Sequence, residues 1–253
     1  MDVDKRFQIG KHSDVGRVRD LNEDAFGTVQ TFHIAEELEN ELGTLVAVAD
    51  GMGGHAAGEV ASQEAIKVLF ESYYSQMAKD LGKALLAAII RANEHVYQLA
   101  CNDCEKAHMG TTLVAAVLKD HRIYVANVGD SRAYLIRGES VRQITHDHSW
   151  VAEQVRARLM TQEQAERHVY KNVITRAVGS NSNVHIDTFR EGLKSRDWIL
   201  LCTDGLSNKV NTTEIASILD VIPNPETAAQ EMVHLASERG GEDNITAVIV
   251  RVH

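Results

Sequence analysis

Four aspartates of this chain stand at or near a glycine at one end of an apolar, strand-like run: Asp50, Asp130, Asp204 and Asp243. A strand end holds a carboxylate rigidly, and a neighbouring glycine leaves the main chain open to a ligand. Carboxylate and carbonyl oxygens are the ligands that hard divalent cations take. Asp-Gly is also a common turn dipeptide, so four unrelated surface turns would give the same pattern. A single copy favours a turn, and the repetition favours a cation site.

The densest copy lies in residues 44–59, TLVAVADGMGGHAAGE. Its run of small and β-branched residues predicts a buried strand that ends at Asp50. Four glycines follow that aspartate within eight residues, and a helical pattern begins directly after them. The sequence therefore predicts one acid on a strand end, with accessible main chain from Gly51 onward.

The identity of the cation follows from the available ligands. If the four strand ends converge, their carboxylates repel one another and raise one another's pKa values, and divalent cations would remove that cost. The chain offers no matched set of Cys or His ligands. Ligation by oxygen alone favours Mg²⁺ or Mn²⁺ over zinc.

A second charged segment, SDVGRVRDLNEDAF, places Arg19 shortly before the adjacent acids Glu23 and Asp24. Neighbouring residues of an extended segment point to opposite faces. One acid would then bind a cation directly, while the other would act through water or orient its partner. Arg19 offers the planar fork that matches phosphate oxygens. A solvated charged loop is the alternative.

Composition limits the class of protein. The 253 residues are 44% hydrophobic and include only two prolines, which predicts one globular domain over residues 1–253. The net charge of −10 argues against nucleic acid or an anionic membrane as the main partner. Residues 1–16 lack the apolar core of a signal peptide, and no run approaches the roughly 18 apolar residues of a membrane span. We therefore expect a cytoplasmic protein.

The three cysteines fit that compartment, because an odd number makes a poor disulfide framework. Cys202 lies in an apolar run and is expected to be an inert core residue. Cys101 and Cys104 form a CxxC with His108 nearby, so a redox pair or a partial zinc site has to be considered. No second CxxC completes a tetrahedral set, which argues against a functional role.

The elements that must position the acids are predicted from periodicity. Strands are expected at both ends of 7–32 and at 111–118, 122–128, 132–137, 141–145, 197–202 and 245–252. Helices are expected within 33–43, 58–74 and 83–100, after Thr212 or Thr213, and from Pro225 to Gly240, with Asn224 as N-cap. The turns at 119–121 and 138–140 are short, so the strands between 111 and 145 should pair as an antiparallel meander.

Residues 146–184 interrupt the β pattern with polar helical segments, and Thr161 to Gln164 fits a capping box. With Met160 as an apolar tip and several arginines around it, this segment is expected to form a flap subdomain beside a site. His146 and His148 form a His-x-His pair that suits a metal. Hydrogen bonding within the loop is the more common use of such histidines.

Taken together, the motifs resemble a known family. They are RVRDLNEDAF, VADGMGGHAAGE, MGTTLVAAVL, VANVGDSRAYL, ITHDHSW, LLCTDGL and GGEDNITAVIV, and they span nearly the whole chain in order. This set resembles the metal-dependent PP2C, or PPM, protein serine/threonine phosphatases, and it is most similar to their compact bacterial members. The resemblance implies an α+β fold, a four-layer α-β-β-α sandwich of two antiparallel sheets flanked by helices.

The resemblance also implies roles for individual residues. Asp50 would bridge two Mn²⁺ or Mg²⁺ ions, and the Gly51 carbonyl would bind one of them. Asp204 and Asp243 would complete the shell of the second ion.

Four further roles are implied in the same way. Glu23 and Asp24 would act on the metals directly or through coordinated water, and Arg19 would hold the substrate phosphate. Asp130, with Asp204, matches the third and weaker metal site of bacterial members.

The activity that the resemblance implies is hydrolysis of phosphoserine and phosphothreonine in proteins by a metal-activated water. Eukaryotic relatives carry a histidine two positions after the bridging aspartate, where this chain has Met52. His55 matches the bacterial form and is one candidate for the general acid. A water held by Asp130 is the other candidate.

Family analogy suggests phosphorylated proteins as partners, including substrates of a cognate Ser/Thr kinase, and a monomeric enzyme. Two alternatives stay open. A phosphatase of small phosphate esters would share the same metal site. A non-catalytic phosphoprotein-binding module would be expected to have lost ligands, and all the matching acids are present.

Overall fold

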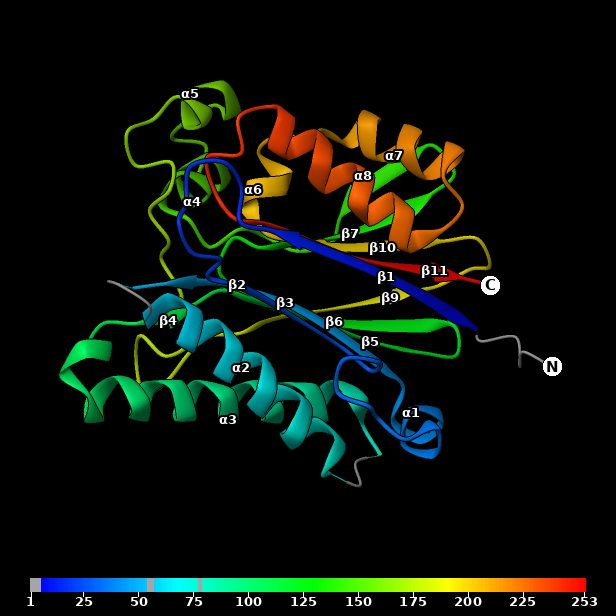
Figure 1. The fold of residues 1–253 in the computed structure, drawn as a ribbon, viewed down its shortest axis with the longest axis horizontal. Helices are drawn as coiled ribbons and strands as arrows, with labels where there is room; N and C mark the ends of the chain where they lie inside the picture. Colours follow the sequence, from blue (N-terminus) through cyan, green and yellow to red (C-terminus); the bar gives the residue numbers. More distant parts are fainter. Residues whose placement is uncertain (1–5, 54–56, 77–78) are drawn as a thin grey trace.

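The computed structural model describes residues 6–53, 57–76 and 79–253. Two antiparallel sheets pack face to face, and helices cover both outer faces (Figure 1). The four-layer α-β-β-α sandwich expected from the sequence is confirmed. Both sheets contain apolar strands whose two faces are buried, which is why these strands appear in the sequence as continuous apolar runs rather than as alternating ones.

The first sheet has five strands in the order β1-β11-β10-β7-β8. Their bounds are Phe7–Asp14 for β1, Ile245–Val252 for β11, Trp198–Cys202 for β10, Arg132–Arg137 for β7 and Ser140–Gln143 for β8. Helices α6 (Asp204–Ser207), α7 (Thr212–Val221) and α8 (Pro225–Glu238) lie on its side of the sandwich, and α7 and α8 cover its outer face (Figure 1).

The second sheet has the strand order β2-β3-β5-β6-β9, and β4 pairs with the end of β3. The bounds are Asp24–Thr28 for β2, Thr44–Met52 for β3, Gly110–Thr111 for β4, Leu113–Lys119 for β5, Arg122–Val128 for β6 and Asp187–Gly192 for β9. Its outer face is covered by α2 (Ala57–Tyr74) and α3 (Leu81–Asn102) (Figure 1). The short helix α1 (Glu36–Leu42) precedes β3, and η1 (Cys104–Lys106) follows α3.

Strand β3 shows how alternate side chains of one strand pack on the two faces of a sheet. Val46 and Val48 point into the core between the sheets, while Leu45, Ala47 and Ala49 pack in the cluster that includes α2 and α3. The period of two along the strand supplies both layers at once. The packing on both faces fixes the register of β3, because a slip of one residue would exchange the two sets of side chains.

The meander expected over residues 111–145 is wrong at its centre. Strand β5 pairs with β6, and β7 pairs with β8, as the short turns predict. Strands β6 and β7, however, belong to different sheets. Residues 129–131 carry the chain from one sheet to the other, and Gly129 has a φ of +104°, a conformation that side chains rarely adopt.

Two smaller expectations are also corrected. Helix α7 is capped by Asn211, which forms a capping box with Glu214, and not by Thr212 or Thr213. Met160 is partly buried, and the exposed apolar residues of the 146–184 segment are Leu159, Val169, Tyr170 and Val173. The N-cap at Asn224 and the capping box at Thr161 are confirmed.

The 146–184 segment contains α4 (Trp150–Arg156) and α5 (Gln162–Glu166). Both helices lie at one end of the sandwich, on the side of α6 (Figure 1). Within the described ranges, no helix combines the length and the apolar character that crossing a bilayer requires.

Candidate metal centre

The predicted acids come from strand ends that the two sheets bring together. In the β2–β3 pair, Asp24 lies directly opposite Asp50. Asp204 follows β10 and Asp243 precedes β11, and these two strands pair antiparallel. Asp130 lies in the segment that crosses between the sheets. Burial, followed by the charges of the other four aspartates, raises the pKa of Asp50.

Glu23 and Asp24 point in opposite directions, as an extended segment predicts. Asp24 reaches across to the other sheet, where the Thr203 hydroxyl donates to its Oδ2 at 2.9 Å. Glu23 lies toward the start of α2: a side chain added at Gly58 would place its Cβ 2.3 Å from Glu23 Oε1. The two neighbouring acids therefore serve different sides of one centre.

Within the described ranges, three carboxylate oxygens at this centre are buried without a hydrogen-bond partner. They are Glu23 Oε1, Asp24 Oδ1 and Asp130 Oδ1. A buried carboxylate oxygen without a partner is costly, and a divalent cation is a group that would supply one. These unpartnered oxygens are the feature of the site that suits it to divalent ions.

The raised pKa values of the aspartates also show that their charged forms are costly here. Burial, followed by the charges of neighbouring aspartates, raises the pKa of Asp130 to about 7. Burial raises the pKa of Asp24 to about 7 as well, against the opposing effect of hydrogen bonds from Thr246 and Thr203. Burial and then the charge of Asp243 raise the pKa of Asp204. Placing cations among these groups would reverse the effect of their mutual repulsion.

Asp50 and Gly51 are held by their main chain. The Asp50 N–H donates to the Thr112 hydroxyl at 2.9 Å, and the Asp50 carbonyl accepts from the Thr112 N–H at 2.9 Å. The Gly51 N–H donates to the Glu23 carbonyl at 3.0 Å. A Cβ at Gly51 would lie 2.0 Å from the Gly58 carbonyl oxygen, so only glycine lets the strand end meet the helix start here.

Arg19 is placed at the same centre. Its guanidinium forms a two-point ion pair with Asp243, with Nε to Oδ1 at 2.9 Å and Nη2 to Oδ2 at 3.0 Å. The hydrogen bond that Arg19 donates to Asp243, followed by the charge of Asp243, raises the pKa of Arg19. About half of the Arg19 side chain is exposed, so the group can also face an incoming anion.

The acids do not form a closed shell around a single ion. Among the described residues, no group of three or more His, Cys, Asp or Glu side chains has the arrangement that could hold a metal by itself. An ion at this centre would need water or main-chain oxygen beside the carboxylates. Mg²⁺ suits such a site because it keeps several of its waters.

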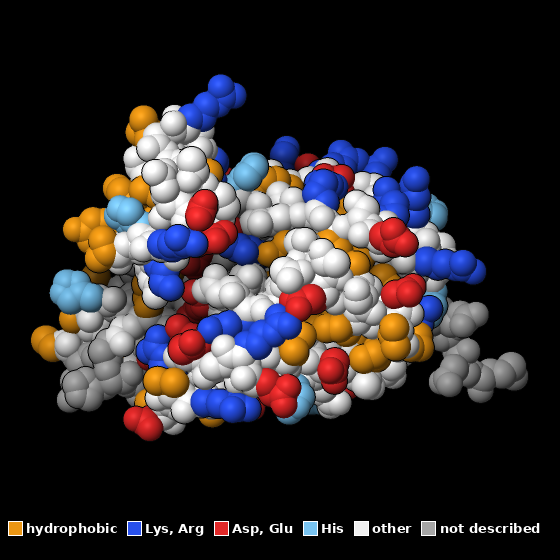
Figure 2. Space-filling model, turned by 90° about the horizontal axis from the view of Figure 1, so that it is seen from above, with side chains coloured by type: hydrophobic (Ala, Val, Ile, Leu, Met, Phe, Trp, Pro, Cys, Tyr) orange, Lys and Arg blue, Asp and Glu red, His pale blue; other side chains and the backbone are white. Residues whose placement is uncertain are grey.

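A cleft of about 870 Å³ opens between these acids and the 146–184 segment. Asp130, Asp204 and Asp243 line one side of the cleft, and residues of α4 and α5 line the other. Figure 2 shows acidic and basic side chains gathered around a hollow on this face. The cleft is large enough to admit a side chain of another protein.

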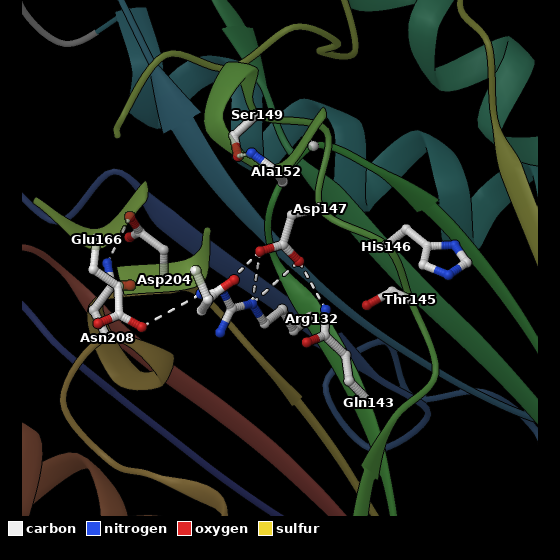
Figure 3. Close-up of polar contacts among 12 residues, drawn as sticks. Arg132, Gln143, Thr145, His146, Asp147, Ser149, Ala152, Glu166, Asp204 and Asn208 are labelled. Atoms are coloured by element: carbon white, nitrogen blue, oxygen red, sulfur yellow. Dashed lines mark hydrogen bonds and ion pairs between the residues drawn. The ribbon is translucent and has the colours of Figure 1, made fainter. Parts of the chain in front are cut away.

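The cleft also contains an ion pair, between Arg132 and Asp147, whose role the sequence motifs did not indicate. Asp147 accepts from Arg132 Nε at 2.9 Å and Nη2 at 2.6 Å, and from Gln143 Nε2 at 2.7 Å (Figure 3). Arg132 stands two residues after Asp130, and its charge partly offsets the burial and the carboxylate repulsion that raise the pKa values of Asp130 and Asp204. The signal in the sequence was the arginine that ends GDSR and the aspartate of ITHDHSW.

The His-x-His pair does not meet at a metal-like site. His148 is fully buried and hydrogen-bonds through both ring nitrogens, while His146 stacks edge-on against Phe189. Burial lowers the pKa of His148. Use of the histidines in hydrogen bonding and packing, the more common of the two alternatives, is what the structure shows. His55, the other predicted histidine, lies outside the described residues.

The cysteines carry no sign of chemistry. All three are free, Cys101 and Cys104 are exposed, and Cys202 is buried. Burial raises the pKa of Cys202 to about 12, so this thiol stays protonated and unreactive at neutral pH.

Comparison with known proteins agrees with the sandwich. Residues 10–245 match the family model described as Protein phosphatase 2C. The chain belongs to the protein phosphatase 2C family. A curated relative, the serine/threonine phosphatase stp of Listeria welshimeri, is 38% identical over 242 residues, which are 94% of this chain and 93% of the relative.

Solved structures of the family superpose on nearly all of the chain. The serine/threonine phosphatase PstP/Ppp of Mycobacterium tuberculosis is 34% identical and has a TM-score of 0.86, covering 98% of this chain and 99% of that protein. A structure of the catalytic domain of PstP in complex with two manganese ions is 34% identical and has a TM-score of 0.83, covering 97% and 98% of the two chains. Solved structures that are similar to nearly the whole of this chain thus include one in complex with two manganese ions.

Proposed function

We propose that this protein phosphatase 2C member hydrolyses phosphoserine and phosphothreonine in proteins, with two Mn²⁺ or Mg²⁺ ions at the strand-end acids. The observation that carries the proposal is the set of buried carboxylate oxygens that lack partners within the described residues, Glu23 Oε1, Asp24 Oδ1 and Asp130 Oδ1. A purely structural cluster of acids would have been given cationic or hydrogen-bonding partners by the chain itself. The PstP structure with two manganese ions supports the same assignment.

The proposed ligands follow the placement of each side chain. Asp50 lies opposite Asp24 and would bridge the two ions, with the Gly51 carbonyl on one of them. Asp204 and Asp243, at the paired ends of β10 and β11, would hold the second ion.

Glu23 and Asp24 would act on the ions directly or through water. Asp130, with its unpartnered Oδ1, would hold a third and weaker ion together with Asp204.

The ions, when bound, would lower the pKa of a water and neutralise charge on the phosphate during in-line attack. The chain supplies the remaining steps. Arg19 would bind phosphate oxygens through its planar fork, and its present pairing with Asp243 keeps that fork at the centre. Either His55 or a water beside Asp130 would deliver the proton to the departing serine or threonine oxygen.

The substrates we propose are phosphorylated proteins, including those of a cognate Ser/Thr kinase, and the enzyme is proposed to act as a monomer of one domain. The 146–184 segment would serve as the flap of that domain, because α4 and α5 line the cleft opposite the acids. A side chain that carries phosphate would enter between the flap and the acids.

The test is release of phosphate from phosphoserine and phosphothreonine peptides by the metal-free protein, before and after addition of Mn²⁺. We expect activity only with the ion, and we expect Asp50→Ala and Asp243→Ala each to abolish it. Calorimetric titration of Mn²⁺ into the same variants gives a readout that does not depend on turnover. Activity that survives both substitutions would overturn the metal assignment, and turnover of small phosphate esters alone would overturn the protein substrate.

A further inference from the structure

His148 is a fully buried histidine that the proposed reaction does not use. It makes two hydrogen bonds to a single glycine: its backbone N–H donates to the Gly129 carbonyl at 3.0 Å, and its ring Nδ1 accepts from the Gly129 N–H at 3.1 Å. Both polar groups of the Gly129 main chain are therefore held by one residue from a distant part of the chain.

Gly129 is held from its other side as well. A Cβ at this position would lie 2.6 Å from atoms of the Thr112 side chain, and Asn127 Nδ2 donates to the Gly129 carbonyl at 3.1 Å. Its φ of +104° belongs to the crossing between the two sheets. The residue that follows is Asp130, so the conformation of Gly129 sets the direction in which Asp130 leaves the strand.

The hydrogen bonds define the state of the His148 ring. Because Nδ1 accepts from a peptide N–H, Nδ1 carries no hydrogen, and the ring hydrogen of the neutral form lies on Nε2. Nε2 is 3.2 Å from Asp187 Oδ2, to which it donates. Arg176 Nη1 also lies near Nε2, at 3.1 Å, but its acceptor is Asp187 Oδ1 at 3.0 Å.

Asp187 is itself fixed by the second sheet. It is the first residue of β9, and its partner across the β6–β9 pair is Asn127. The carboxylate therefore stands at the end of β6 where the chain turns toward Asp130. A carboxylate that accepts from one ring nitrogen fixes the tautomer and the orientation of the histidine, as it does for the histidines of metal sites.

We propose that His148 is a positioning residue for Asp130: Asp187 holds the ring in the tautomer that accepts from the Gly129 N–H, and this contact aims the Asp130 carboxylate at an ion. The inference rests on the proposed function, in which Asp130 binds the third and weaker ion. The buried Asp130 Oδ1, which has no partner within the described chain, is the atom that would be aimed.

The experiment is calorimetric titration of Mn²⁺ into the metal-free full chain and four variants: Asp130→Ala, His148→Gln, His148→Asn and the double variant Asp130→Ala with His148→Gln. The asparagine amide oxygen can take the place of Nδ1, whereas glutamine carries its amide near the position of Nε2. We expect Asp130→Ala to remove the weak binding step. We expect His148→Gln to weaken the same step by about tenfold or more.

Two further results are expected. His148→Asn should retain most of the affinity, because it restores the acceptor for the Gly129 N–H. The double variant should bind like Asp130→Ala alone, since a positioning residue has no effect once its target is gone. A general loss of stability would not produce either pattern.

Asp197→Asn is the matched control. Like Asp130, Asp197 is a buried aspartate, but it is paired with Arg137 and lies just before β10. It should leave the weak step unchanged. If Asp130→Ala removes the weak step and His148→Gln leaves it intact, the role of His148 is overturned. If Asp130→Ala changes no binding step, the third ion of the proposed function is overturned, and the positioning role is overturned with it.

Discussion

The two ends of strand β10 carry aspartates that the chain treats in opposite ways. Asp197, just before the strand, accepts from Arg137 Nε at 2.8 Å and Nη2 at 2.7 Å, and from the Lys194 N–H at 2.7 Å. Asp204, just after the strand, lies among other acids, and burial followed by the charge of Asp243 raises its pKa. One end of the strand is neutralised by an arginine, whereas at the other end Asp204 accepts from the uncharged Asn208 Nδ2 at 3.2 Å.

This difference separates a structural acid from a functional one. At Asp197 the positive partner is part of the fold, so the carboxylate contributes to stability in every state of the protein. At the Asp204 end the repulsion between carboxylates is retained, which costs stability in the absence of ions. Functional sites commonly keep such costs because the ligand removes them.

The largest effect is expected from changing the Asp204 end. Asp204→Asn should lower phosphatase activity by about 10²- to 10³-fold, because a ligand of the second and third ions is lost. The metal-free variant should melt at a higher temperature than the wild type, since one repelling charge is gone. Initial rates on a phosphothreonine peptide and thermal melts in the presence of a chelator measure the two effects.

The matched change at the Asp197 end should have the reverse pattern. Asp197→Asn should destabilise the protein by about 1 to 2 kcal/mol, because the charge-assisted hydrogen bonds from the largely exposed Arg137 are lost. Urea denaturation gives the free energy of unfolding. The dependence of activity on Mn²⁺ concentration should stay as in the wild type. A shift in that dependence would contradict a purely structural role for Asp197.

Arg19→Lys tests a smaller contribution at the acidic end. Lysine keeps the charge and loses the planar fork, so kcat/KM should fall by about tenfold while Mn²⁺ affinity is retained. Arg19→Ala should cost more. Unchanged kinetics in both variants would remove Arg19 from phosphate binding and leave it only as the partner of Asp243.

The free energy of unfolding of the metal-free protein should depend on pH because of the acids clustered near Asp204. Burial is the largest cause that raises the pKa values of Asp24 and Asp130 to about 7 in the folded chain. An aspartate in an unfolded chain has a pKa of about 3.9. The folded state therefore binds more protons between these values, and the stability of the metal-free protein should fall as the pH rises from about 5 to about 8.

Thermal melts across that pH range provide the measurement. Saturating Mn²⁺ should flatten the trend, because the ion replaces the protons at these carboxylates. A metal-free protein whose melting temperature rises steadily over the same range would contradict the raised pKa values assigned to these acids.

Much of the architecture was predictable because it depends on local signals. The apolar runs, the capping box at Thr161 and the cap at Asn224 are properties of neighbouring residues, and the structure confirms them. The cap of α7 was misplaced by one residue, since Asn, Thr and Thr are consecutive and each is an acceptable cap.

The crossing between β6 and β7 could not be predicted in the same way. A short turn argues for a hairpin, but here the packing of two sheets and the conformation of Gly129 decide the path. The acids were recognised by their strand ends, whereas their convergence came from a family resemblance. The pairs Arg132 with Asp147 and His148 with Asp187 depend on tertiary contacts that no spacing encodes.

The most direct test of the central claim is calorimetric titration of Mn²⁺ into the metal-free wild-type chain and into Asp50→Asn. The account predicts at least two bound ions in the wild type, a melting temperature that rises with Mn²⁺ concentration, and loss of the tight binding steps in the variant. Equal and weak binding by both proteins, with no change in melting temperature, would contradict it.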